Sequence, residues 1–95
     1  MGAENEVRLD VSDLEPPDPL LRILAAAEEL AEGQHLHVLH RRTPCLLYTN
    51  LEQRGFAHHT LMPGPEAPCE VYIWRREDRQ ARHALPSEIT KEIHP

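Results

Sequence analysis

Long apolar runs, leader segments and aromatic residues are all scarce in this sequence of 95 residues. No apolar run approaches the roughly 20 residues that a membrane-spanning helix needs. The N-terminus has no basic stretch followed by an apolar one, which argues against a signal peptide, and Glu6 stands where a myristoylation signal beginning at Gly2 would have Ser or Thr. These absences predict a cytoplasmic protein without a membrane partner. Since aromatic residues make up only 4% of the chain, the core is expected to consist mostly of Leu, Val, Ile and Ala.

Cysteine and clustered positive charge are also in short supply. Cys45 and Cys69 are too few for a disulfide scaffold and too far apart for a CxxC redox motif, so both are expected to be reduced thiols in the cytoplasm. The formal net charge is −6; residues 1–32 carry nine acidic and two basic side chains, and residues 33–76 carry five basic and three acidic ones. A nucleic-acid-binding protein needs a broad basic face, so that class is excluded.

Apolar residues recur with periods that alternate between strand and helix along the chain. Val7, Leu9 and Val11 alternate with polar residues, as in a half-buried strand. The other elements that the pattern predicts are strands over 35–40, 56–62 and 69–75, a helix from the prolines near residue 17 to about Glu32, and a helix from Pro44 to Gly55. The predicted order is therefore βαβαββ.

This order predicts the arrangement of the layers. Each βαβ unit has parallel strands and a right-handed crossover, so both helices lie on the same side, and the final hairpin makes the fourth strand antiparallel. The fold class is thus α+β: a two-layer α/β sandwich with a four-stranded mixed sheet and two helices on one face. One domain is expected over residues 1–76, followed by a polar C-terminal tail over residues 77–95.

The first predicted strand is followed by a distinctive set of residues, Leu9-Asp10, Leu14 and Pro17-x-Pro19. This set resembles the start of the TusA/SirA-like sulfur carriers, which share the βαβαββ order and have a Cys-Pro-x-Pro motif at this turn. In that family the cysteine holds sulfur as a persulfide and passes it to a partner. The resemblance implies the family's strand order, 1-2-4-3. Pro16 occupies the cysteine position here, so the resemblance supports the fold but not the persulfide chemistry.

Further residues are similar to an uncharacterised branch of these proteins, a domain of unknown function. They are Glu15-Pro-Pro-x-Pro-Leu20, Val38-Leu39-His40, Pro44, Leu47-Tyr48 and Leu51-x-x-Arg54-Gly55-Phe56. The resemblance covers about residues 7–75. The tail falls outside it.

The proline-rich turn is predicted to be mainly structural. Its three prolines remove three amide donors from the start of the first helix, and Asp13, Glu15 and Asp18 surround that helix start with negative charge. The acidic side chains already offset the positive end of the helix dipole, and few amide donors remain. This helix N-terminus is therefore a poor site for an anion or a thiolate.

The start of the second helix is flanked by cations instead. His40, Arg41 and Arg42 precede it, Thr43 is its expected N-cap, and Cys45 lies in its first turn. Helix N-termini and nearby cations both favour the thiolate, so Cys45 is the more reactive of the two cysteines. The same five residues alternatively form an anion site without covalent chemistry. A first-turn position is a weak signal, and an incidental surface cysteine beside a solvated basic turn is the default interpretation of Cys45.

Seven histidines raise the question of a metal site. The two groups that the predicted fold brings together are His35, His37 and Asp10 on one sheet face, and His40, Cys45 and Cys69 at one end of the sheet. His59 would lie about 9–10 Å from the first group, two strands away, whereas zinc binds its ligands at about 2 Å. Both groups are far less specific than paired CxxC motifs, so neither a metal site nor a cofactor is predicted.

The sheet face turned away from the helices carries several polar and aromatic side chains. Its expected residues are Arg8, Asp10, His35, His37, His59, Tyr72 and Trp74. Tyr and Trp are enriched in binding hot spots, so His37, Tyr72 and Trp74 are predicted to contact a protein partner.

The C-terminal tail is the alternative occupant of that face. Leu85, Ile89 and Ile93 have the spacing of one stripe of a short helix after Ser87. Such a helix would fold over the sheet and bury the aromatic side chains. The sequence leaves this alternative and the partner surface equally open.

Catalytic motifs are missing: there is no Ser/His/Asp set, phosphate loop or pair of buried carboxylates. The sequence therefore predicts a non-enzymatic module that binds a protein partner or a small anion, linked to sulfur or redox metabolism by resemblance alone. One alternative is a sulfur or redox carrier that uses Cys45 assisted by His40, and another is a metal-binding sensor. The sequence does not indicate the oligomeric state.

Overall fold

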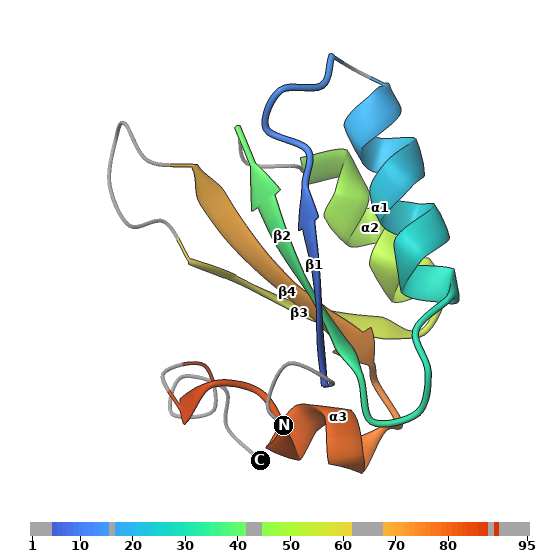
Figure 1. Ribbon diagram of the computed structural model, residues 1–95. Helices are drawn as coiled ribbons and strands as arrows, with labels where there is room; N and C mark the ends of the chain where they lie inside the picture. Colours follow the sequence, from blue (N-terminus) through green and yellow to red (C-terminus); the bar gives the residue numbers. More distant parts are fainter. Residues whose placement is uncertain (1–4, 16, 42–44, 62–67, 88, 90–95) are drawn as a thin grey trace.

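The computed structural model describes residues 5–15, 17–41, 45–61, 68–87 and 89 (Figure 1). Their helices and strands follow in the order β1 (Glu6–Asp10), α1 (Asp18–Glu28), β2 (His35–His40), α2 (Cys45–Gln53), β3 (Phe56–Leu61), β4 (Cys69–Arg75) and α3 (Arg79–His83). Within this described part of the chain, no helix has both the length and the apolar character needed to cross a bilayer.

The sheet confirms the predicted topology. Its strand order is β1-β2-β4-β3; β1 pairs with β2 in parallel, and β4 pairs antiparallel with both β2 and β3. Both α1 and α2 lie on one face of this sheet (Figure 1). The α+β fold, the βαβαββ order and the mixed sheet that the sequence predicts are therefore all present.

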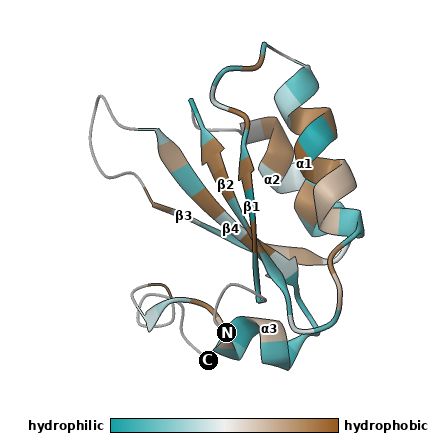
Figure 2. Ribbon diagram, in the orientation of Figure 1, coloured by the Kyte–Doolittle hydropathy of each residue, from teal (hydrophilic) through white to brown (hydrophobic). Residues whose placement is uncertain are grey.

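The main core lies between this sheet face and the two helices. The period-two pattern of the strands turns Leu36 and Val38 of β2 toward the helices, together with Val71 and Ile73 of β4. Figure 2 shows the resulting alternation of apolar and polar residues along β4. The helices contribute the apolar stripes expected from their 3.6-residue period, which include the side chains of Ile23, Leu24, Ala27, Leu47 and Leu51.

Helix α1 ends earlier than the sequence predicts, at Glu28 rather than near Glu32. The guanidinium of Arg75 donates hydrogen bonds to the carbonyls of Glu28 and Leu30, which satisfies acceptors at the helix end. The chain then turns at Gly33, whose φ of 85° lies in the left-handed region. The carbonyls at the end of α1 are thus bonded by a side chain from β4, 45 residues away from Leu30.

The opposite sheet face is covered by the C-terminal part of the chain. Leu85 and Ile89 pack with Ala81 against Tyr72 and Trp74 of β4, in a second apolar cluster separate from the main core. Of the two alternatives that the sequence left open for this face, the structure shows the tail covering these two aromatic residues.

The tail holds a helix that the sequence did not predict, α3, which spans Arg79–His83 and ends before Leu85. The helix that the sequence predicts after Ser87 agrees with the structure at the two described residues there, because Ser87 and Ile89 are both helical. Ile93, the third residue of the predicted stripe, lies outside the described residues. The division into a domain over 1–76 and a tail over 77–95 stays a prediction.

Asp78 joins the tail to the sheet domain. Its carboxylate caps α3 by accepting a hydrogen bond from the Ala81 amide at 3.0 Å, and it also accepts one from the Gly33 amide at 2.7 Å. The hydrogen bonds from Gly33 and Ala81 hold the pKa of the Asp78 carboxyl below its ordinary value. One ionised side chain therefore satisfies amides from two segments that are far apart in sequence.

We predict that Asp78→Ala lowers the free energy of unfolding by about 1–2 kcal/mol at neutral pH, as expected for the loss of a helix N-cap. A depressed folded-state pKa contributes stability above the unfolded value, near about pH 3.9, and that stability is lost as the pH falls through the folded value. The difference in free energy of unfolding between wild type and Asp78→Ala, measured by urea unfolding, should consequently become smaller below about pH 4. The matched control is Glu77→Ala, which removes the exposed neighbouring carboxylate; an equal loss in both variants would contradict the prediction.

Candidate functional site

The carboxyl ends of β1 and β2 bring the two predicted helix starts to one end of the sheet. Because these strands are parallel and each leads into a helix, α1 and α2 both begin at this edge. Helix α1 has Pro17 at its N-cap position and no side-chain capping hydrogen bond. We call the region formed by these helix starts and the residues just before them the helix-start edge.

The basic turn before α2 is ion-paired with the proline-rich turn. Arg41 Nη2 lies 3.5 Å from Glu15 Oε2, and both side chains are well exposed. An exposed ion pair of this kind contributes little stability, but it offsets part of the positive charge that the sequence places here. Arg42 and Thr43 lie outside the described residues. Cys45 is the first residue of α2, as expected, and its side chain is not among those described.

His40 is the last residue of β2 and lies opposite Cys69 of β4 in the sheet register, so the predicted proximity of these two residues is present. Burial, and secondarily the charge of Arg41, lowers the pKa of the His40 imidazole below its ordinary value. Cys69 is buried, with 5% of its surface exposed. Among the described residues, no group of three or more His, Cys, Asp or Glu side chains is arranged to hold a metal ion. The metal-sensor alternative therefore gains no support from them.

Two exposed leucines also belong to the helix-start edge, and sequence analysis missed them. Leu21 in the first turn of α1 is 59% exposed, and Leu46, the second residue of α2, is 75% exposed. They are the exposed large hydrophobic residues of the described part of the chain. Helical periodicity contained the signal, because both leucines fall outside the apolar stripes that pack on the sheet.

The predicted partner surface on the opposite sheet face is buried instead. His37, Tyr72 and Trp74 are 5%, 6% and 4% exposed. For the aromatic pair the cause is the tail, because Leu85 and Ile89 pack with Tyr72 and Trp74. A partner can reach Tyr72 and Trp74 only if these tail residues move away. The role of all three side chains in binding stays a prediction.

A network of histidines and carboxylates crosses the same face. His35 Nε2 lies 3.1 Å from Glu6 Oε1, and His37 Nδ1 lies 3.3 Å from Glu6 Oε2. On its other side, His37 Nε2 lies 2.8 Å from Glu70 Oε1. The ring of His37 is stacked on that of Tyr72 with centroids 4.3 Å apart. Sequence analysis placed both histidines on this face but did not identify either carboxylate as a partner.

A small cavity opens beside this network, at the end of β1. Its volume is about 260 Å³, and its lining consists of Arg8, Leu9, Asp10, His37 and Leu39. Asp10 accepts hydrogen bonds from both the hydroxyl and the amide of Ser12, and these bonds lower the pKa of its carboxyl. Asp10 is thus bonded to Ser12 and does not join His35 and His37, which the metal hypothesis had allowed.

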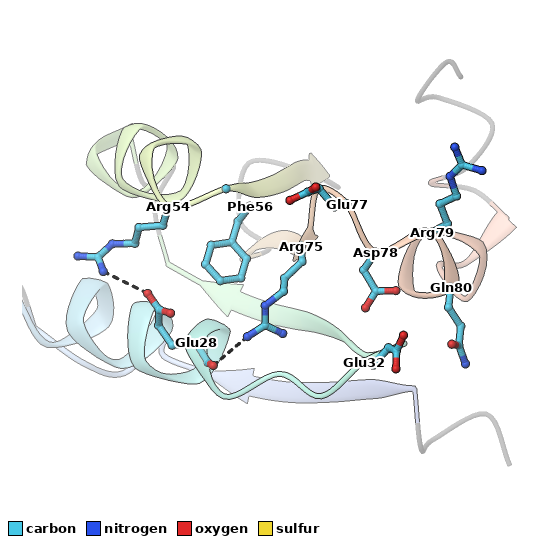
Figure 3. A pocket seen from close by; sticks show the side chains of 10 residues that line it. Glu28, Glu32, Arg54, Phe56, Arg75, Glu77, Asp78, Arg79 and Gln80 are labelled. Carbon is cyan, nitrogen blue, oxygen red and sulfur yellow. Dashed lines mark hydrogen bonds and ion pairs between the residues drawn. The ribbon is translucent and has the colours of Figure 1, made fainter.

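A larger cavity of about 640 Å³ lies at the opposite end of the sheet (Figure 3). The guanidinium of Arg54 forms an ion pair with Glu28 at 3.2 Å, and Arg75 donates to the backbone carbonyl of Glu28 at 2.9 Å. Arg75 also lies over the ring of Phe56, 5.7 Å from its centroid. These two arginines already hold α1, α2 and β4 together, so we assign this cavity a structural role.

The family comparison identifies most of the chain. The family model described as "Uncharacterized conserved protein (DUF2249)" matches residues 8–75, which is close to the range over which the sequence resembled a domain of unknown function. No curated protein and no solved structure matches the chain. The wider relation to the TusA/SirA-like carriers rests on sequence resemblance and stays a prediction.

We predict that Arg41→Gln raises the pKa of His40 toward its ordinary value, because the variant removes the nearby positive charge while burial remains. The companion variant Glu15→Gln leaves Arg41 without its counter-charge and should move the pKa further down. An NMR titration of the His40 side chain measures both shifts. Arg54→Gln, at the other end of the sheet, is the control; equal shifts in Arg41→Gln and the control would contradict this account of the edge.

Proposed function

The chain belongs to the DUF2249 family of uncharacterized conserved proteins, and we propose that it is a non-enzymatic module that binds a protein partner through its helix-start edge. The observation that carries the proposal is the exposure of Leu21 and Leu46 in the first turns of two helices that begin at the same edge. No cofactor enters the proposal.

Exposed apolar side chains support a protein as the partner. A single exposed leucine is ordinary on a protein surface, whereas neighbouring apolar side chains with a polar rim are typical of interfaces. At this edge the charged side chains of Glu15, Asp18 and Arg41 are exposed as well as the two leucines. A partner that covers the leucines would remove their apolar surface from water, which is the main favourable term in association.

A small anion is the weaker candidate for the same edge. The guanidinium of Arg41 is already paired with Glu15, and exposed Asp13 and Asp18 add negative charge on the α1 side. An anion would have to compete with these carboxylates for one exposed arginine. The charge distribution therefore favours a protein surface of mixed charge over a small anion.

The resemblance to TusA/SirA-like carriers suggests the context in which such a module works. Those proteins pass sulfur from the turn before their first helix to a protein partner, so their helix-start edge is a docking surface as well as a reactive one. In this chain Pro16 occupies the position of the reactive cysteine. We propose that docking at the edge is retained without that chemistry, and that the partner belongs to sulfur or redox metabolism.

Leu21→Asp combined with Leu46→Asp tests the proposal. Loss of a central apolar contact at an interface costs about 2 kcal/mol per residue, or roughly 30-fold in Kd. In an extract of the source cells, a partner protein that cross-links to wild type should thus no longer cross-link to the double variant at equal concentration. Ala31→Asp, an exposed position beyond the opposite end of α1, is the control and should retain it. Equal retention by the double variant, or robust catalytic turnover by the isolated protein, would contradict the proposal.

A carrier that uses Cys45 is the second candidate, because Cys45 is the first residue of α2. Helix N-termini favour a thiolate. The lowered pKa of His40 keeps its imidazole neutral near pH 7, so it has a lone pair with which to accept the thiol proton. In this alternative a persulfide sulfur is transferred from a donor protein to the Cys45 thiolate, and the donor thiolate leaves.

Persulfide loading separates the two candidates. We expect that incubation with a persulfide-carrying donor protein leaves Cys45 without an added sulfur atom, as measured by peptide mass spectrometry. Cys69→Ser removes the buried thiol and isolates the response of Cys45, while Cys45→Ser provides the blank. A sulfur adduct on Cys45 in wild type and in Cys69→Ser would replace the binding module with the carrier.

A further inference from the structure

His37 lies between two carboxylates that come from different strands. Its Nδ1 is 3.3 Å from Glu6 Oε2 of β1, and its Nε2 is 2.8 Å from Glu70 Oε1 of β4. The imidazole is 6% exposed, while the two carboxylates are 26% and 29% exposed. The ring thus bridges three neighbouring strands, and the carboxylates reach toward solvent on either side of it.

The number of hydrogen-bond donors determines the protonation state of this bridge. An ionised carboxylate only accepts hydrogen bonds, and a neutral imidazole has a single N–H. Both contacts of His37 can be hydrogen bonds only if both ring nitrogens carry a proton. Partial burial by itself would raise the pKa of the Glu6 carboxyl, but its hydrogen bonds to His35 and His37 outweigh burial and lower it, so Glu6 is ionised. For both contacts to be hydrogen bonds to ionised carboxylates, the bridging proton must therefore lie on His37.

The protonated ring also supports the surface on which the tail lies. His37 stacks on Tyr72 with an interplanar angle of 9°, and Tyr72 packs with Trp74 against Leu85 and Ile89. A cation over an aromatic face is favoured electrostatically. The position of Tyr72, and with it one side of the binding surface for the tail, consequently depends on the charge of His37.

We propose that the proton on His37 holds Leu85 and Ile89 of the tail on the sheet, so that loss of this proton loosens their packing and exposes Tyr72 and Trp74. The proposal is independent of partner binding at the helix-start edge. It assigns a regulatory role to the residues that the sequence predicted as a partner surface.

Deprotonation at Nδ1 is the step that loosens this packing. The N–H bond at Nδ1 breaks, its electron pair stays on the nitrogen, and the proton passes to water in the 260 Å³ cavity that His37 lines. The shorter contact, from Nε2–H to Glu70, persists. The lone pair on Nδ1 then faces the ionised carboxylate of Glu6, and this repulsion displaces the ring from Tyr72.

The elements that pack around this face carry other charged and titratable groups, which must be separated from His37 experimentally. They are Glu6, Arg8 and Asp10 on β1, His35 on β2, His59 on β3, Glu70 and Tyr72 on β4, and Arg79, Arg82 and His83 on α3. His35 is the closest competitor because it shares Glu6. Its Nδ1 is buried without a hydrogen-bond partner among the described atoms, so a second proton on His35 would have no acceptor there.

Trp74 makes this loosening measurable, because it is the single tryptophan of the chain and only 4% exposed. In wild type we expect its emission to shift to longer wavelength and its acrylamide quenching constant to rise several-fold as the pH increases from about 6 to about 9. Far-UV circular dichroism should show that the sheet persists over this range. Nitrogen-15 NMR of the His37 ring should show two protonated nitrogens on the closed side of the transition and one on the open side.

Three variants assign the response. In His37→Gln the pH dependence of Trp74 should disappear, because the amide cannot take up a proton. Glu70→Gln keeps the imidazole but removes one of the two carboxylates that favour the protonated ring. The transition should therefore move to lower pH in this variant. His59→Gln, a histidine opposite Tyr72 in the sheet register, should behave as wild type. The proposal would be overturned if quenching of Trp74 in wild type did not change with pH, if the transition disappeared in His59→Gln, or if it survived in His37→Gln. A singly protonated His37 ring at pH 6 would overturn it as well. If His37→Gln does not fold, the NMR measurement on wild type decides.

Discussion

The burial of β2 on both faces is the constraint from which the other features follow. This strand pairs with β1 on one side and with β4 on the other, and its first four residues are buried. Its alternating side chains turn Leu36 and Val38 toward the helices, and His35 and His37 toward the tail. A strand with apolar residues on one face and histidines on the other requires hydrogen-bond partners for the histidines, because unsatisfied buried polar groups are costly.

Glu6 and Glu70 supply those partners, and they do so from the strands on either side of β2. The polar network therefore depends on the same strand pairing that forms the main core. The polar network also divides the sheet face opposite the helices into two different halves. Tyr72 and Trp74 are covered by the tail, whereas Arg8 and Asp10 stay exposed beside the small cavity. His37 lies at the boundary between these halves, because it stacks on Tyr72 and also lines the small cavity.

The two ends of the sheet have different roles. At one end, side chains such as Arg75 and Asp78 are committed to carbonyls and amides of the protein itself and hold the elements in place. At the other end, Leu21 and Leu46 extend into solvent from the first turns of their helices. Apolar side chains are exposed where the parallel strands end, and internal hydrogen bonds occupy the opposite end.

The elements were determined by the sequence itself, since strand and helix periods, prolines and turn glycines act over a few neighbouring residues. Those local patterns predicted the strands, the start of α1 and the histidines of one face; the strand order came from the family resemblance. Only the tertiary structure decided that the tail covers Trp74, that Arg41 meets Glu15 and that Arg75 bonds the carbonyl end of α1. It also decided that carboxylates 31 and 33 residues away in sequence flank His37. These contacts arise from strand register and from the docking of distant segments, and no local period along the chain encodes either one.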